Sequence, residues 1–207
     1  MKSPSPALDR LSVWGFSLLI DCARTVLYRN TRSCSVALIS DYAPDNASVQ
    51  AMSQLMKAVE ADDLKAVETL LTQGVDVNEK DAGSRNFPVI IAAYRGHDAI
   101  LERLLHAKAD LTVLDPGMKA TALHAASYAG RTKAASLLIQ HGIAIDQTGP
   151  FNGYTALHDA ASQGHRDTVA VLLEGGADRS IRNDAGQTAI DMAQHRGDQA
   201  LIKLLSA

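Results

Sequence analysis

Aromatic side chains are scarce in this sequence: only 4 % of its 207 residues are Phe, Trp or Tyr, although 46 % are hydrophobic. The interior must therefore be built from Leu, Ala, Val and Ile, and a chain rich in small alanines favours closely packed helices over a thick single core. Basic residues are not in excess, because the formal net charge is −3 at pH 7. Nucleic-acid-binding proteins usually carry a basic surface. We therefore expect no nucleic-acid partner.

Cysteines and long apolar runs are also few. The two cysteines, Cys22 and Cys34, have no partner at a spacing typical of metal ligands. The apolar run LSVWGFSLLI at residues 11–20 ends at Asp21 and is too short to span a bilayer. We expect no integral membrane segment and a cytoplasmic protein.

Residues 1–51 form an N-terminal extension outside the regular pattern of the chain. Lys2 and Arg10 precede the apolar run, as in a secretory signal, but no clean small-residue cleavage site follows it. Three interpretations remain open. The first is an export signal, which would place the protein in the periplasm or outside the cell. The second is an amphipathic segment packed on the first repeat, and the third is a stretch upstream of a native start near Met52.

An internal repeat dominates the rest of the chain. Alanines recur in short apolar segments at spacings of 34, 34, 34 and 33 residues: Ala58, Ala92, Ala126, Ala160 and Ala193. Four residues after these alanines stand Asp62, Gly96, Gly130, Gly164 and Gly197. A Leu-Leu or Leu-Ile pair follows the first four alanines after 12 residues. Such a period is typical of a solenoid of stacked units.

The repeated segments resemble the ankyrin repeat family. Its T-P-L-H-x-A-A motif appears as TALHAAS (121–127) and TALHDAA (155–161), and in degraded form as FPVIIAA (87–93) and TAIDMAQ (188–194). The resemblance covers residues 52–207, and the plain repeats are similar to those of small bacterial ankyrin proteins. It implies an all-α solenoid of helix-turn-helix units joined by hairpin loops. The expected repeats are about 52–81, 82–115, 116–149, 150–183 and 184–207.

Several motif positions have a structural explanation. Threonines at helix starts can cap the first helix of a repeat, and glycines four residues after the aligned alanines can end it in the left-handed conformation. The resemblance implies that the motif histidines bond to backbone groups of adjoining loops. The predicted structural residues are Thr121, His124, Thr155, His158, Gly96, Gly130, Gly164 and Gly197.

The cluster His158, Asp159 and His165 suggests an alternative, an enzyme or metal-binding protein. Neighbouring side chains on a helix point about 100° apart, so we expect His158 to face the adjoining repeat and Asp159 the open surface. A catalytic histidine would need a nucleophile or water and an orienting partner. We therefore favour a non-catalytic protein without cofactor or metal.

The remaining histidines do not change this preference. No two histidines have the i, i+4 spacing of a helical zinc motif. His106 and His141 fall near the ends of second helices, where a partly positive side chain suits the helix dipole.

A partner would bind the extended concave face that stacked repeats present. Stacking is expected to place Tyr94 beside Tyr128, and Tyr and Arg are frequent in binding hot spots. We expect a monomer that binds another protein, of unknown identity, through this face and the hairpin tips, as an adaptor, inhibitor or effector. The predicted docking residues are Tyr94, Arg95, Tyr128, Phe151, Tyr154, Asp159 and Gln163.

Overall fold

The computed structural model describes residues 53–149 and 152–206. Within these ranges the chain forms ten helices and no strand. The predicted N-terminal extension at residues 1–51 and the docking residue Phe151 lie outside the described residues.

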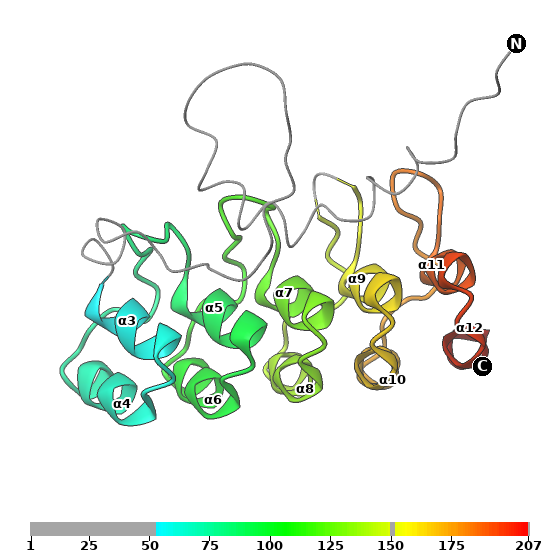
Figure 1. The fold of residues 1–207 in the computed structure, drawn as a ribbon. Coiled ribbons are helices and arrows are strands. Elements are labelled where there is room, and N and C mark those ends of the chain that lie inside the picture. Colours follow the sequence, from blue (N-terminus) through cyan, green and yellow to red (C-terminus); the bar gives the residue numbers. More distant parts are fainter. Residues whose placement is uncertain (1–52, 150–151, 207) are drawn as a thin grey trace, which may run out of the picture.

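The helices form five pairs that follow one another along the molecule (Figure 1). The first helices of the pairs are α3 (Gln54–Glu60), α5 (Pro88–Arg95), α7 (Ala122–Tyr128), α9 (Ala156–Gln163) and α11 (Ala189–Arg196). The second helices are α4 (Leu64–Thr72), α6 (Asp98–His106), α8 (Thr132–Gln140), α10 (Arg166–Glu174) and α12 (Gln199–Ser206). The first helices make one row, the second helices a row beneath it, and the connecting hairpins project beyond the first row (Figure 1). The predicted all-α solenoid of helix-turn-helix units is confirmed.

Small residues allow neighbouring first helices to approach closely. The aligned alanines of the second to fifth pairs are fully buried: Ala92, Ala126, Ala160 and Ala193. Each of these helices packs on the next, from α5 to α7, α9 and α11. Leu104, Leu138 and Leu172 of the second helices are also 0 % exposed and complete the core. The core therefore runs as one narrow strip through all pairs, as expected for a repeat stack.

Helix starts are fixed by local hydrogen bonds. The Thr121 hydroxyl accepts the His124 amide proton at 3.3 Å, and the Thr155 hydroxyl accepts that of His158 at 3.5 Å. In the last pair, where Asp replaces the motif histidine, the Thr188 amide and hydroxyl both donate to the Asp191 carboxylate. Both α9 and α11 therefore begin with a capping box, in which the side chain at the third helical position accepts the amide proton of the capping threonine.

Helix ends follow the repeat pattern. Gly164 ends α9 in the left-handed conformation at φ 81°, and Gly96 and Gly197 end α5 and α11 in the same way. In the third pair Ala129 ends α7, and Gly130 follows it at φ 67°. A residue with a Cβ atom is disfavoured in this region. Glycine there lets the chain reverse into the second helix.

Candidate protein-binding surface

The predicted residues of the first helices lie at the ends of successive helices. Tyr94 and Arg95 end α5, Tyr128 ends α7 and Gln163 ends α9. Arg95 is exposed, whereas the two tyrosines and Gln163 are half-buried. The Arg95 guanidinium pairs with the Glu60 carboxylate of α3 at 2.9 Å. The structure therefore distributes these four side chains along one edge of three neighbouring first helices.

Side chains of the following repeat fix the backbone of both tyrosines. Nε of Arg131 donates to the carbonyl oxygen of Tyr94 at 3.1 Å. Nε2 of His165 donates to the carbonyl oxygen of Tyr128 at 3.0 Å. Carbonyl groups at a helix end have no partner within the helix. These bonds satisfy such groups and hold each aromatic residue relative to the next repeat.

The sequence analysis did not predict that Arg131 and Arg196 bond to the ends of the preceding first helices. Nη1 of Arg196 donates to the carbonyl oxygen of Ser162 at 2.8 Å, so the bonding continues into the last pair. Arg131 follows a glycine at the position that His165 occupies in the Gly-His pair of the next repeat. That register was visible in the sequence and could have indicated a shared role.

His124 and His158 link each first helix to the next hairpin. Nε2 of His124 donates to the carbonyl oxygen of Tyr154 at 3.0 Å, and Nε2 of His158 donates to that of Gln187 at 3.0 Å. Nδ1 of each ring lies beside the threonine hydroxyl three residues earlier, at 2.8 Å and 2.9 Å. Such bonds are of the kind that the resemblance implies.

Burial controls the protonation of both rings. His124 and His158 are 3 % and 1 % exposed. Removal from water lowers the pKa of His124 and of His158, because a charged ring is costly to bury. The neutral ring, with a proton on Nε2 and a lone pair on Nδ1, matches the observed partners.

Tyr154 lies between the fourth and fifth repeats. Its ring stacks on His158 with centroids 5.5 Å apart, and its hydroxyl donates to Sδ of Met192 at 3.7 Å. Burial, with a smaller contribution from the nearby Asp159 carboxylate, raises the pKa of Tyr154. The half-buried phenol is thus positioned by packing on two repeats.

The prediction that Asp159 faces the open surface is wrong. Its exposed fraction is 3 %, and Oδ2 is buried without a hydrogen-bond partner. Asp159 precedes the aligned Ala160, and Ala125 and Met192 at the equivalent positions of the adjoining repeats are buried as well. Burial raises the pKa of the Asp159 carboxyl well above its usual value. The Asp159 side chain therefore offers no charged contact to a partner.

The structure does not assemble His158, Asp159 and His165 into a reactive site. Among the described residues no hydrogen bond joins any two of them, and both ring nitrogens of His158 have other partners. No group of three or more His, Cys, Asp or Glu side chains in the described ranges could hold a metal ion. A catalytic constellation would require such convergence.

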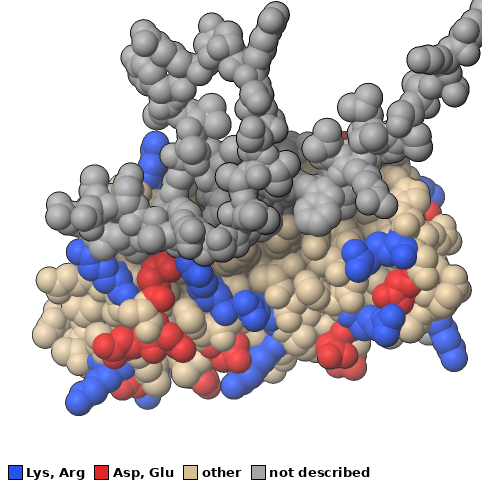
Figure 2. Space-filling view, in the orientation of Figure 1, with Lys and Arg blue, Asp and Glu red and all other residues tan. Residues whose placement is uncertain are grey.

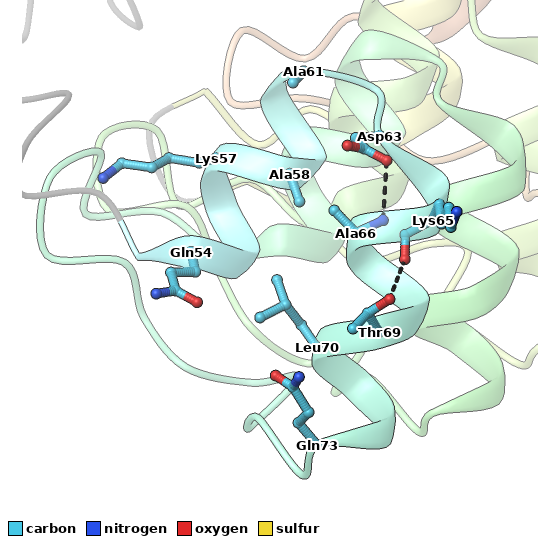
Figure 3. A pocket seen from close by; sticks show the side chains of 10 residues that line it. All are labelled: Gln54, Lys57, Ala58, Ala61, Asp63, Lys65, Ala66, Thr69, Leu70 and Gln73. Atoms are coloured by element: carbon cyan, nitrogen blue, oxygen red, sulfur yellow. Dashed lines mark hydrogen bonds between the residues drawn. The ribbon is translucent and has the colours of Figure 1, made fainter.

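A groove of about 660 Å³ lies on the first repeat, between α3 and α4 (Figure 3). Ala58 and Leu70 are among its lining residues. Its polar side chains bond locally: the Asp63 carboxylate accepts the Ala66 amide proton, and the Thr69 hydroxyl donates to a backbone carbonyl one turn earlier. These groups do not converge on a common point in the groove. The groove is the outer face of the first described repeat.

Opposite charges are interspersed on the face seen in Figure 2. Arg103 of α6 pairs with Glu68 of α4 at 2.7 Å. Arg166 of α10 pairs with Asp198, which precedes α12, at 2.8 Å. These ion pairs join neighbouring repeats.

These features define a class of protein: a helical-repeat solenoid whose first helices and hairpins present one continuous surface. A family model described as ankyrin repeats (3 copies) matches residues 89–183 and 149–207, which together span more than half of the chain. The chain belongs to the ankyrin repeat family. The comparison with curated proteins gives no significant match. Within the described ranges, every helix is too short or too polar to cross a membrane.

Proposed function

We propose that this chain is a non-catalytic interaction module that binds another protein through its concave face and hairpin tips. Ankyrin repeats are generally protein–protein interaction modules, and this chain belongs to that family. The binding face that we propose consists of Tyr94, Arg95, Tyr128, Phe151, Tyr154 and Gln163. It omits Asp159 as a charged contact because that carboxyl is buried.

The observation that carries the proposal is the fixed placement of three tyrosines on successive repeats. Tyr94 and Tyr128 are held through their carbonyl groups by side chains of the following repeat. Tyr154 is held by its ring on His158. A tyrosine whose backbone is already fixed, or whose ring is already packed as in Tyr154, loses less conformational freedom when a partner binds. Pre-ordered tyrosines therefore favour a binding role for this face.

The chain would act as a monomeric adaptor, inhibitor or effector in the cytoplasm. No observation in the described residues favours the alternative of an enzyme or metal-dependent protein that uses His158, Asp159 and His165. Both ring nitrogens of His158 and Nε2 of His165 bond within the protein, and the Asp159 carboxyl is buried. The proposed function requires neither a cofactor nor a nucleic acid.

The experiment is isolation of the partner with the purified full chain, followed by hydrogen exchange with and without that partner. We expect protection of amides near the C-terminal ends of α5, α7 and α9 and in the hairpin that carries Tyr154. Protection confined to the second helices α6, α8 and α10 would contradict the proposed face. The exposed second-helix residues Lys133 and Gln140 provide an internal reference for unaffected exchange.

A further inference from the structure

Two exposed histidines from neighbouring repeats meet at the ends of the second helices. His106 is the last residue of α6, and His141 directly follows α8. Their rings contact each other edge to face, with centroids 5.8 Å apart and planes at 79°. The helix dipole explains why each end favours a histidine, but not why the two rings meet.

Backbone bonds determine which nitrogen of each ring is available. Nδ1 of His106 lies 2.7 Å from the carbonyl oxygen of Glu102, and Nδ1 of His141 lies 2.9 Å from that of Leu137. Because a carbonyl oxygen only accepts, each Nδ1 carries the proton in the neutral ring. Each Nε2 then keeps its lone pair. A ligating histidine typically donates its other ring N–H to a carbonyl in this way.

The ring separation suits a shared ion. Zn–N distances are about 2.0–2.1 Å, so two imidazoles on one ion have centroids roughly 4.5–6 Å apart, depending on the N–metal–N angle. The 5.8 Å observed for His106 and His141 falls within that range. Both side chains are exposed, so water can complete the coordination. Imidazole nitrogen suits Zn²⁺, Cu²⁺ and Ni²⁺.

The pair occurs at one junction of the described stack. In the 34-residue register the equivalent pairs at the neighbouring junctions are Thr72 with Ala107 and Gln140 with Gly175. Two histidines 35 residues apart form this contact only because α6 and α8 pack together. A search within single helices for the i, i+4 zinc motif does not detect it.

We propose that His106 and His141 form a two-histidine site for a divalent transition-metal ion, with Nε2 of each ring as the ligand and water in the remaining positions. A bound ion would tie α6 to α8 and so connect the second and third repeats. Since Cu²⁺ exceeds Zn²⁺ in affinity for sites of a given type, Cu²⁺ is expected to bind more tightly here. The site lies on the second helices and does not depend on the proposed partner-binding face.

The test is calorimetric titration of the untagged full chain with Cu²⁺ and with Zn²⁺. Cys22→Ser and Cys34→Ser are introduced throughout, so that thiolates cannot bind the ion. We expect one ion per chain, and at least tenfold weaker binding after either His106→Gln or His141→Gln. Because both variants lose the same chelate, the double variant should be little weaker than each single one.

The control is His195→Gln, which removes a lone exposed histidine from α11 and should leave the affinity unchanged. Nitrogen resonances of the imidazoles provide a second readout: Zn²⁺ should shift Nε2 of both His106 and His141. Absence of binding at millimolar Zn²⁺ and Cu²⁺ would overturn the proposal. Equal loss of affinity in all three single variants, or no loss in His106→Gln and His141→Gln, would overturn it as well.

Discussion

Nε2 of His158 donates to the carbonyl oxygen of Gln187 at 3.0 Å, and so joins α9 to the hairpin of the following repeat. The Thr155 amide and hydroxyl lie beside Nδ1 of the same ring, at 3.2 Å and 2.9 Å. Both nitrogens of a ring that is 1 % exposed are thus used within the protein. His158 therefore connects two repeats through a buried ring.

Replacement of His158 by Ala should lower the free energy of unfolding by about 2–4 kcal/mol, since it leaves a cavity and removes the partner of the Gln187 carbonyl. Urea unfolding followed by circular dichroism measures this loss through the transition midpoint. His195→Ala, at an exposed position of α11, is the matched control and should change stability by less than about 0.5 kcal/mol. Equal midpoints for wild type and His158→Ala would contradict the structural role.

Stability should depend on pH through His124 and His158. Burial lowers the pKa of both rings from the ordinary value of 6.5, so the unfolded chain binds more protons than the folded chain below that value. The stabilisation is fully present above pH 6.5 and is lost as the pH falls through the folded-state values. Urea midpoints between pH 7.5 and 5 measure the loss, and His124→Gln plus His158→Gln should reduce its slope. An unchanged slope in that double variant would exclude these rings as the source.

Asp159→Asn should stabilise the protein at pH 7 by about 1–2 kcal/mol, because it removes a buried carboxyl that must lose its charge or remain without a partner. The raised pKa of Asp159 gives the opposite pH dependence to that of the histidines: its favourable contribution is present below pH 3.8 and is lost as the pH rises through the folded-state value. The stabilisation caused by Asp159→Asn should therefore be smaller at pH 4 than at pH 7. Thermal unfolding at both pH values measures the difference. Glu79→Gln, at an exposed hairpin position, is the control, and destabilisation of Asp159→Asn at pH 7 would refute the prediction.

Gly153→Ala should destabilise the chain more than Gly142→Ala. Both glycines have positive φ, 65° and 81°, so each substitution carries a backbone cost of about 1 kcal/mol. A Cβ atom on Gly153 would lie 2.5 Å from Oδ1 and 2.9 Å from the backbone nitrogen of Asp184, whereas one on Gly142 would meet no atom within 4 Å. The hairpin before Tyr154 should therefore shift only in the first variant. Urea midpoints compare the two, and equal losses would show that the Asp184 contact is easily relieved.

The sequence allowed accurate prediction of the periodic part of the fold. The spacing of 34 residues between the motif alanines, and the threonines at helix starts, are both visible in the sequence, and the helices begin directly after those threonines, as at Thr121 and Thr155. The exposure of Asp159 was predicted wrongly because the 100° step along a helix does not reveal how closely the adjoining helices pack. Contacts between repeats, such as His106 with His141, arise from the stacking register and have no signature within one helix.

The most direct test of the proposed binding face is the dissociation constant of the isolated partner for the Tyr128→Ala plus Tyr154→Ala double variant. Hot-spot tyrosines contribute about 2 kcal/mol or more each, so the loss of both should weaken affinity on the order of 1,000-fold. Lys203→Ala, an exposed change on α12, should bind as wild type does. Circular dichroism must show that the double variant is folded at the temperature of the titration. An unchanged dissociation constant for the folded double variant would contradict binding through these tyrosines.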